Sequence, residues 1–342
     1  MRRLVAGAAF VVLAAAVLAP GGASGPAPAP PGRQFLKTVV GFTPADFASL
    51  DTGKAVTRRI ETKDKTEVAA AGAIDIHADP AALLEATRDM ARLRRVPEIL
   101  EIGVFSDPPR VEDLAGLNFS DDDYEALRKC RIGKCDVKLG APIIERLGRE
   151  MDWSAPDARE KAVALAKEEM VAYVKRYQAG GTAAMAGIAD KASPRSRADE
   201  FAALLAASPY IVEYLPEFFA YLRDYPRGRP AQARDVFYWT RDKFGPKPVI
   251  SVYHVTVHRQ DTLAVMAQKL IYASHYFNAG LETWGVTDSP AGQGFELILV
   301  YRTRLDPPTG MLSGVLMGKI KDGVESVVRA NLQAGKARAE GR

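Results

Sequence analysis

The fold is decided by a stretch in which a predicted strand runs into a predicted helix, Ile74-Asp75-Ile76-His77-Ala78-Asp79-Pro80-Ala81-Ala82-Leu83-Leu84-Glu85. Small and apolar residues alternate with others from Glu67 to Ala78. One face of this strand is formed by Val68, Ala70, Gly72, Ile74 and Ile76. Asp79 is suited to cap a helix, and Pro80 to its first turn, where the missing N–H costs nothing. The stretch therefore predicts a strand followed at once by a helix.

Strand patterns continue on both sides of this stretch. Residues 53–61 form another strand candidate, and the polar turn Thr62-Lys63-Asp64-Lys65 joins them to the strand at 67–78, which predicts a hairpin. Ile99 to Phe105 is a third candidate, ended by Asp107-Pro108-Pro109.

The middle of the chain changes to a mostly helical pattern, from about 109 to 234. Helix starts are indicated at Ser120, which precedes three aspartates, and at Ser154-Ala155-Pro156-Asp157. Gly180-Gly181 ends the second of these helices, and shorter helices are predicted at 195–207 and 211–221.

Strand patterns then return, and the chain closes with a long helix. Strands are predicted at 236–240, 249–259, 263–283 (bent or broken within) and 295–305. In the final helix, at about 312–338, apolar residues recur every four positions: Leu312, Leu316, Ile320, Val324, Val328 and Leu332.

This order of elements resembles the helix-grip fold of the START, polyketide-cyclase and birch-pollen-allergen superfamily. The resemblance is carried by the stretch Ile74 to Glu85 and by the final helix, which follows the turn Asp306-Pro307-Pro308-Thr309-Gly310. It implies an α+β fold in which a curved antiparallel sheet wraps around a long C-terminal helix, with a cavity between them. The mostly α-helical insertion departs from the family pattern, so that it could roof the cavity, plug it or form a second lobe.

The sequence features and the resemblance together divide the chain into five parts. We expect a signal peptide at 1–24, a Pro/Ala-rich linker at 25–33, the first part of the helix-grip domain at 34–108, the helical insertion at 109–234 and the second part of the domain at 235–338.

The N-terminus has the features of an export signal. Arg2 and Arg3 precede an uncharged run from Leu4 to Ala19, and Pro20 to Gly25 supplies a helix break and small residues for cleavage. The run of sixteen residues is shorter than the roughly 20 that span a bilayer. We expect a periplasmic or secreted protein, and a retained N-terminal anchor is the alternative.

The composition of the chain limits the kinds of partner that we expect. The 342 residues are 47% hydrophobic and 26% charged, with a formal net charge of +4. Nucleic-acid binding would call for a dense basic patch, which the sequence lacks. No apolar segment after the signal is long enough to span a membrane. These features predict a globular protein without a nucleic-acid partner.

The two cysteines, Cys130 and Cys135, are five residues apart. In an oxidising compartment such a close pair favours a structural disulfide. Nearby basic residues also allow a redox pair, although redox enzymes typically use Cys-x-x-Cys. Zinc is disfavoured because no histidine is near in sequence. We therefore predict a disulfide and no metal site.

Two of the four histidines, His254 and His258, share one face of a predicted strand but lie about 13 Å apart, too far to chelate one metal. The segment around His275 is rich in aromatic and polar residues. If it is extended, Tyr272, Ser274, Tyr276 and Asn278 share a face. Whichever face points inward would give an apolar cavity a few polar anchors, or would only pack on the C-terminal helix.

With the resemblance, the cavity-lining candidates are His254, His258, Tyr272, Ser274, His275 and Tyr276, joined by Leu316 and Ile320 of the final helix. The chain contains no nucleophile elbow, zinc-protease motif, phosphate loop or dinucleotide fingerprint. We expect binding of a small, largely apolar or lipid-like ligand without a cofactor. The alternatives are a cyclase- or hydrolase-like enzyme using the same cavity, and a non-catalytic envelope structural or interaction protein.

Overall fold

The computed structural model describes residues 31–341, except residues 95, 261–262 and 291. The predicted signal peptide at 1–24 and most of the linker lie outside the described residues. The predicted linker extends to residue 33, but residues 31–33 belong to helix α1 (Pro31–Phe35). Arg33 forms ion pairs with Asp51 and Glu296, so this short helix is tied to the sheet.

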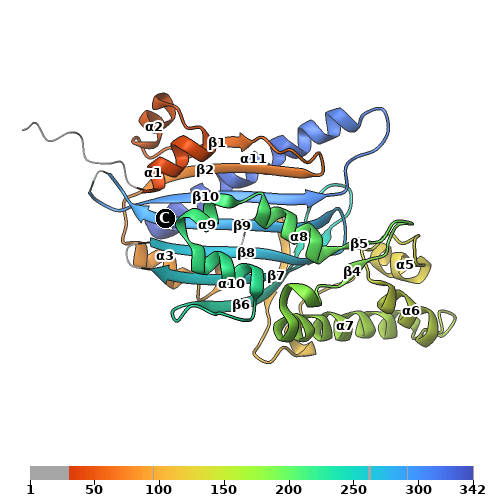
Figure 1. Cartoon of the computed structure of the whole chain (residues 1–342). Helices are drawn as coiled ribbons and strands as arrows, with labels where there is room; N and C mark the ends of the chain where they lie inside the picture. The colour runs from red at the N-terminus through yellow and green to blue at the C-terminus, as the bar shows by residue number, and fades with distance from the viewer. Residues whose placement is uncertain (1–30, 95, 261–262, 291, 342) are drawn as a thin grey trace, which may run out of the picture.

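An eight-stranded antiparallel sheet forms the centre of the molecule (Figure 1). Its strand order is β1-β2-β10-β9-β8-β7-β6-β3. The strands are β1 (Val56–Ile60), β2 (Glu67–Ile76), β3 (Ile99–Val104), β6 (Arg234–Asp242), β7 (Val249–Gln260), β8 (Leu263–Ala273), β9 (Phe277–Asp288) and β10 (Phe295–Leu305). The predicted α+β class, with its antiparallel sheet and long C-terminal helix, is confirmed.

The predicted strand at 263–283 is two strands, β8 and β9, joined by a tight turn at residues 274–276. Tyr276 has φ of 58°, a left-handed conformation that is uncommon outside glycine. Because the chain reverses here, Tyr272, Ser274, Tyr276 and Asn278 do not share one strand face, which corrects that expectation. A single strand of 21 residues would also exceed the usual length of about 3–10.

One face of the sheet, the C-helix face, carries Val68, Ile74 and Leu297 and packs against α11 (Ser313–Ala339), α3 (Pro80–Ala86) and α4 (Met90–Leu93). A Cβ at Gly72 would lie only 2.9 Å from Cδ1 of Leu332. Along 324–332, α11 therefore packs directly on the sheet. The prediction of a cavity between the sheet and the C-terminal helix is wrong for this segment, because side chains fill that space.

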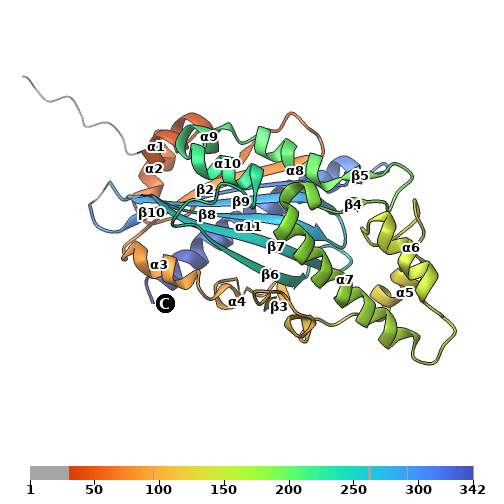
Figure 2. The same cartoon turned by 60° about the horizontal axis from the view of Figure 1, so that its bottom comes forward.

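The opposite face, the insertion face, carries Ile250, Lys269, Leu281 and Ile298 and is covered by α1 and by helices of the insertion (Figures 1 and 2). The inserted helices are α5 (Asp121–Lys129), α6 (Ala141–Glu150), α7 (Ala158–Gly180), α8 (Arg197–Ala206), α9 (Pro209–Tyr214) and α10 (Pro216–Asp224). The insertion also contains the short strands β4 (Gly187–Ile188) and β5 (Arg195–Ser196). Near the N-terminus, η1 (Leu36–Val40) and α2 (Pro44–Leu50) follow α1.

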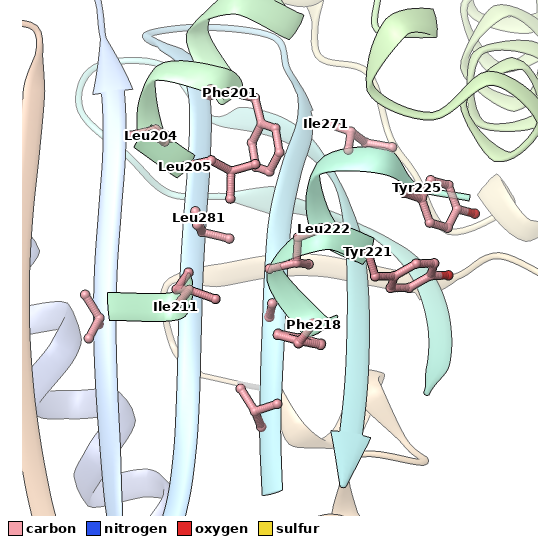
Figure 3. Close-up of a cluster of buried hydrophobic side chains, with 14 of the residues drawn as sticks. Phe201, Leu204, Leu205, Ile211, Phe218, Tyr221, Leu222, Tyr225, Ile271 and Leu281 are labelled. Atoms are coloured by element: carbon pink, nitrogen blue, oxygen red, sulfur yellow. The ribbon is translucent and has the colours of Figure 1, made fainter. Parts of the chain in front are cut away.

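The inserted helices and the sheet share one apolar core. Phe201 and Leu205 of α8, together with Phe218 and Leu222 of α10, point toward Leu281 and neighbouring strand residues (Figure 3). Helices α5 and α6 extend past the ends of the strands (Figures 1 and 2). Among the described residues, no helix is long and apolar enough to cross a membrane.

Candidate functional site

A pocket lies on the insertion face, between the sheet and helices α5 to α8. Its apolar wall comes from Leu127, Val137, Leu139, Leu147, Leu165 and Met170. Its polar groups are Asp123, Lys138, Glu169, Arg197 and Ser274, and the aromatic rings of Tyr173 and Tyr272 complete it. We call this the insertion pocket. Its cavity volume is about 70 Å³.

Two of the predicted site residues line this pocket. The ring of Tyr272 lies 5.2 Å from the guanidinium of Arg197 and 6.4 Å from the ring of Tyr173. The Ser274 hydroxyl accepts a hydrogen bond from the Ile250 N–H at 2.9 Å. The end of β8 and the turn that follows it therefore position Tyr272 and Ser274 at the sheet end of the pocket.

The turn carries the next two predicted residues away from the pocket. His275 is buried, and Tyr276 packs on Phe244, with ring centroids 5.5 Å apart. Neither lines the insertion pocket. The prediction that they share one cavity with Tyr272 and Ser274 is wrong, because the reversal of the chain at 274–276 separates the side chains.

Leu316 and Ile320 also lie outside the insertion pocket. Both belong to α11, on the other side of the sheet. Leu316 is 44% exposed, and Ile320 is partly buried against the core of the C-helix face. The structure therefore does not bring these two residues together with the histidines and Tyr272 in one cavity.

The two strand histidines do share the insertion face, as their spacing predicts. The His258 ring stacks on Phe218 with centroids 5.8 Å apart, and burial lowers the pKa of His258. His254 is fully buried between aromatic rings, with the Phe237 ring 4.6 Å away and nearly parallel to it. Neither histidine lines the insertion pocket.

His254 is the centre of a buried polar network. Its Nε2 lies 2.9 Å from Oδ1 of Asp235, and its Nδ1 lies 3.1 Å from the Tyr177 hydroxyl. Burial lowers the pKa of His254 to about 4, against the opposing effect of Asp235. At neutral pH the imidazole is therefore uncharged: Nε2–H donates to Asp235, and Nδ1 accepts from Tyr177.

Asp235 accepts two further hydrogen bonds. The Thr256 hydroxyl donates to Oδ1 at 2.7 Å, and the Tyr221 hydroxyl donates to Oδ2 at 2.6 Å. Burial opposes ionisation of this carboxyl, but the hydrogen bonds from His254, Tyr221 and Thr256 leave its pKa below the usual value. Asp235 is therefore a carboxylate held by three donors.

Lys269 forms the inner end of the network. It is fully buried, and its ammonium donates to the Tyr177 hydroxyl at 3.1 Å. The rings of Phe201, Tyr177 and Tyr225 surround Nζ, with the Phe201 centroid only 4.4 Å away. Burial lowers the pKa of Lys269 to about 7, which the Asp235 carboxylate opposes. The hydrogen bonds thus run in one direction, from Lys269 through Tyr177 and His254 to Asp235.

A second group of charges lies at the end of the insertion pocket. Arg197 is buried and donates to the carbonyl oxygens of Asn278, Lys138 and Ala273. Among the described residues, no carboxylate lies within ion-pair distance of Arg197. The Lys138 ammonium, also buried, donates to Asp306 at 2.7 Å. Asp306 further pairs with Lys191 and Arg195, and this cluster lowers its pKa to about 2 against the effect of burial.

Sequence reasoning missed Lys269, Asp235 and Arg197 as site residues. One signal was present, since Lys269 is the single charged residue of a mostly apolar strand. Buried cations in such positions are rare and need an explanation. The partners of Lys269 come from α7, α8 and the chain after α10, and no sequence pattern predicts that these segments meet on one strand.

Cys130 and Cys135 form a disulfide, as predicted. It joins the end of α5 to the segment that leads into residues 137–140 of the insertion pocket. Cys130 packs in a small core with Leu127, Val137 and Leu139. The disulfide therefore holds the apolar wall of the pocket. Within the described ranges, no group of three or more metal-ligating side chains comes together.

No family model and no curated protein matches this chain. Among solved structures, it is similar to a STAR-related lipid transfer protein from Xanthomonas axonopodis, at 8% identity over 84% of this chain and 93% of that chain, with a TM-score of 0.36. It is also similar to the Zhui aromatase/cyclase from Streptomyces sp. R1128, at 13% identity over 40% and 87% of the two chains, with a TM-score of 0.25.

A further similar structure is the di-domain aromatase/cyclase StfQ of the steffimycin biosynthetic pathway. Its identity is 16%, its TM-score is 0.25, and the match covers 57% of this chain and 63% of that chain. At such identities and TM-scores, no ligand and no residue role is transferred to this chain.

Proposed function

We propose that this protein is an exported carrier that binds a small, largely apolar or lipid-like molecule in the insertion pocket. The lining of the pocket is the observation that carries the proposal. Apolar side chains from α5, α6 and α7 surround the space, and a few buried polar groups, among them Arg197 and Ser274, lie at its edge. Ligand sites commonly combine an apolar wall with a few polar anchors in this way.

The size of the pocket favours a slender ligand. With about 70 Å³, it takes one short alkyl chain or a small ring more readily than a polycyclic molecule. A second pocket, of about 100 Å³, lies on the same face beneath α1, α9 and α10 and is lined almost entirely by apolar groups, such as Phe35, Leu215 and Val300. None of the described residues that line it is charged, which makes it the natural control site.

Export is the second part of the proposal. Its support is the predicted signal peptide at 1–24, and the disulfide between Cys130 and Cys135 is compatible with an oxidising compartment. Expression of the full chain in a bacterium, followed by cell fractionation and N-terminal mass analysis, tests it. We expect a periplasmic or secreted product that begins near residue 25. A cytoplasmic product that still begins at Met1 would exclude export.

Binding is tested with octan-1-ol, a neutral alkyl probe, by isothermal titration calorimetry. Ala166→Phe fills the insertion pocket, whose wall includes Ala166. Gly285→Leu fills the second pocket, where a Cβ meets no atom within 4 Å. We expect Ala166→Phe to weaken binding at least tenfold and Gly285→Leu to leave it unchanged. The reverse pattern, or no binding to the wild type, would refute the proposed site.

An acid–base enzyme is the second candidate, and the network from Lys269 to Asp235 favours it. Hydrogen-bonded chains of this kind can move a proton between their ends. Against it, none of Lys269, Tyr177, His254 and Asp235 lines the insertion pocket. Hydrolysis of 4-nitrophenyl octanoate that His254→Gln abolishes, with octanol binding intact, would favour the enzyme over the carrier.

A further inference from the structure

A wide groove opens beside the insertion pocket and is lined by arginines. Four of its lining residues are Arg146, Arg149, Arg176 and Arg195, and Glu169 is the one carboxylate among the described residues that line it. Its volume is about 560 Å³, several times that of the insertion pocket. We call it the arginine groove.

The groove and the pocket are contiguous. Both are lined by Gly140, Ile143, Glu169 and Ala186, so these residues form the boundary between them. The pocket side of this boundary is apolar, whereas the groove side is open and basic. A molecule that lies across the boundary therefore has one end among apolar side chains and the other among guanidinium groups.

The charges of the groove are not balanced within it. Glu169 pairs with Arg146, and its contact with Arg176 is long, at 3.7 Å. Arg149 pairs with Glu150 at 2.9 Å, and its side chain is 68% exposed. The side chain of Arg176 is 53% exposed, so both guanidinium groups remain partly accessible to a ligand. Arg146 also has Glu150 and Glu168 as partners outside the lining. Arg149 and Arg176 are thus the most exposed of the groove arginines, each with one carboxylate partner.

We propose that the ligand of the insertion pocket is an amphiphile with an anionic head, a carboxylate or a phosphate, which lies in the arginine groove while its alkyl chain enters the pocket. This inference rests on the proposed binding function and specifies its ligand class. Guanidinium groups bind carboxylates and phosphates with two parallel hydrogen bonds, which makes arginine the suitable residue for such heads. The buried charge of Arg197 at the pocket edge adds to the same attraction.

The test compares ligands that share one eight-carbon chain: octyl phosphate, octanoate, octan-1-ol and octyltrimethylammonium, with inorganic phosphate alone as a further arm. Dissociation constants are measured by calorimetry on the full-length mature protein. We expect the two anions to bind at least tenfold more tightly than octanol, and octyltrimethylammonium to bind more weakly than octanol. Added salt should weaken the binding of the two anions and leave the binding of octanol unchanged.

The matched variants remove two arginines each. Arg149→Gln with Arg176→Gln takes charge from the groove, whereas Arg88→Gln with Arg223→Gln takes it from surface ion pairs elsewhere. We expect the groove variant to bring octyl phosphate within threefold of octanol, and the control variant to bind like the wild type. All four arginines are more than half exposed, so both variants should fold.

Each contrary outcome has a distinct meaning. Equal affinity for octanol and octyl phosphate, or equal behaviour of the two variants, would overturn the anionic head while leaving apolar binding in place. Inorganic phosphate that competes as well as octyl phosphate would show a site for free anions and overturn the amphiphile. Failure of octanol and of both anions to bind would refute the carrier function itself.

Discussion

Lys269 is the residue that most clearly departs from an ordinary sheet protein. A fully buried ammonium is costly unless it is paired, yet its only hydrogen-bond acceptor among the described side chains is the Tyr177 hydroxyl. The surrounding rings favour a cation, while burial favours the neutral amine. The charge on Lys269 therefore changes within the physiological pH range, and the stability of the protein should follow it.

Lys269→Met tests this charge. The pKa of Lys269 is lowered from 10.5 to about 7, so between these values the unfolded chain holds a proton that the folded chain has lost. Wild-type stability relative to the variant must then rise as pH increases from 7 to 10. Urea unfolding at pH 6, 7, 8.5 and 10 measures the difference. A difference that stays constant over this range would mean that the lysine keeps its proton when buried.

At the scale of single residues, the sequence predicts which face of a strand a side chain occupies better than it predicts which side chains it contacts. The two-residue repeat of a strand is enough to place His254 and His258 on one face. The same rule fails for Tyr272, Ser274 and Tyr276, because it assumes an extended chain and the reversal at 274–276 was not predicted. Partners such as Asp235 come from other strands, which a local repeat does not identify.

The disulfide is the element-scale feature most closely tied to the pocket. It closes a loop between the end of α5 and the segment that enters the pocket wall at Val137. A loop this small contributes about 2 kcal/mol in the chain-entropy model.

Replacing Cys130 and Cys135 with serine should therefore lower the free energy of unfolding by about 2 kcal/mol. Octanol binding should weaken as well, because Leu127 and Val137 lose their fixed spacing. Chemical denaturation and calorimetry measure the two effects. Unchanged octanol affinity in a destabilised variant would show that the disulfide does not position the pocket wall.

Helix α11 provides a matched pair of glycines. A Cβ at Gly318 meets nothing within 4 Å, whereas one at Gly335 would lie 2.9 Å from Cδ2 of Leu297. Gly318→Ala should stabilise the protein by about 1 kcal/mol through helix propensity. Gly335→Ala should lose that gain, because Leu297 must shift. Equal stabilisation in thermal unfolding would indicate free space between α11 and the sheet, contrary to the direct packing seen here.

Elements were predicted well where their periodicity is strong. The hairpin, the helix start at Asp79 and the long C-terminal helix all occur as the patterns predict. Helix α6 was not predicted, and the helix expected at 211–221 is two helices, α9 and α10, divided at Pro216. A proline at this point cannot donate its backbone hydrogen bond to the preceding turn.

At the scale of the whole molecule, the location of the pocket depends on which face each set of helices covers. The C-terminal helix lies on the C-helix face and the insertion on the other face (Figure 2), where the insertion helps to line the insertion pocket. The resemblance names the sheet and the final helix but contains no counterpart of residues 109–234. The sequence therefore predicts the class of the fold, while the side of the sheet that holds the pocket emerges only from tertiary packing.

The central claim is that the ligand lies under the insertion and not under the C-terminal helix. Photo-crosslinking with a diazirine-bearing octyl phosphate, followed by peptide mapping, tests it most directly. We predict labelling within residues 137–147 and 165–173, which line the insertion pocket and the arginine groove. Labelling concentrated instead on 313–339 of α11 and on the facing residues of β2 would contradict the account.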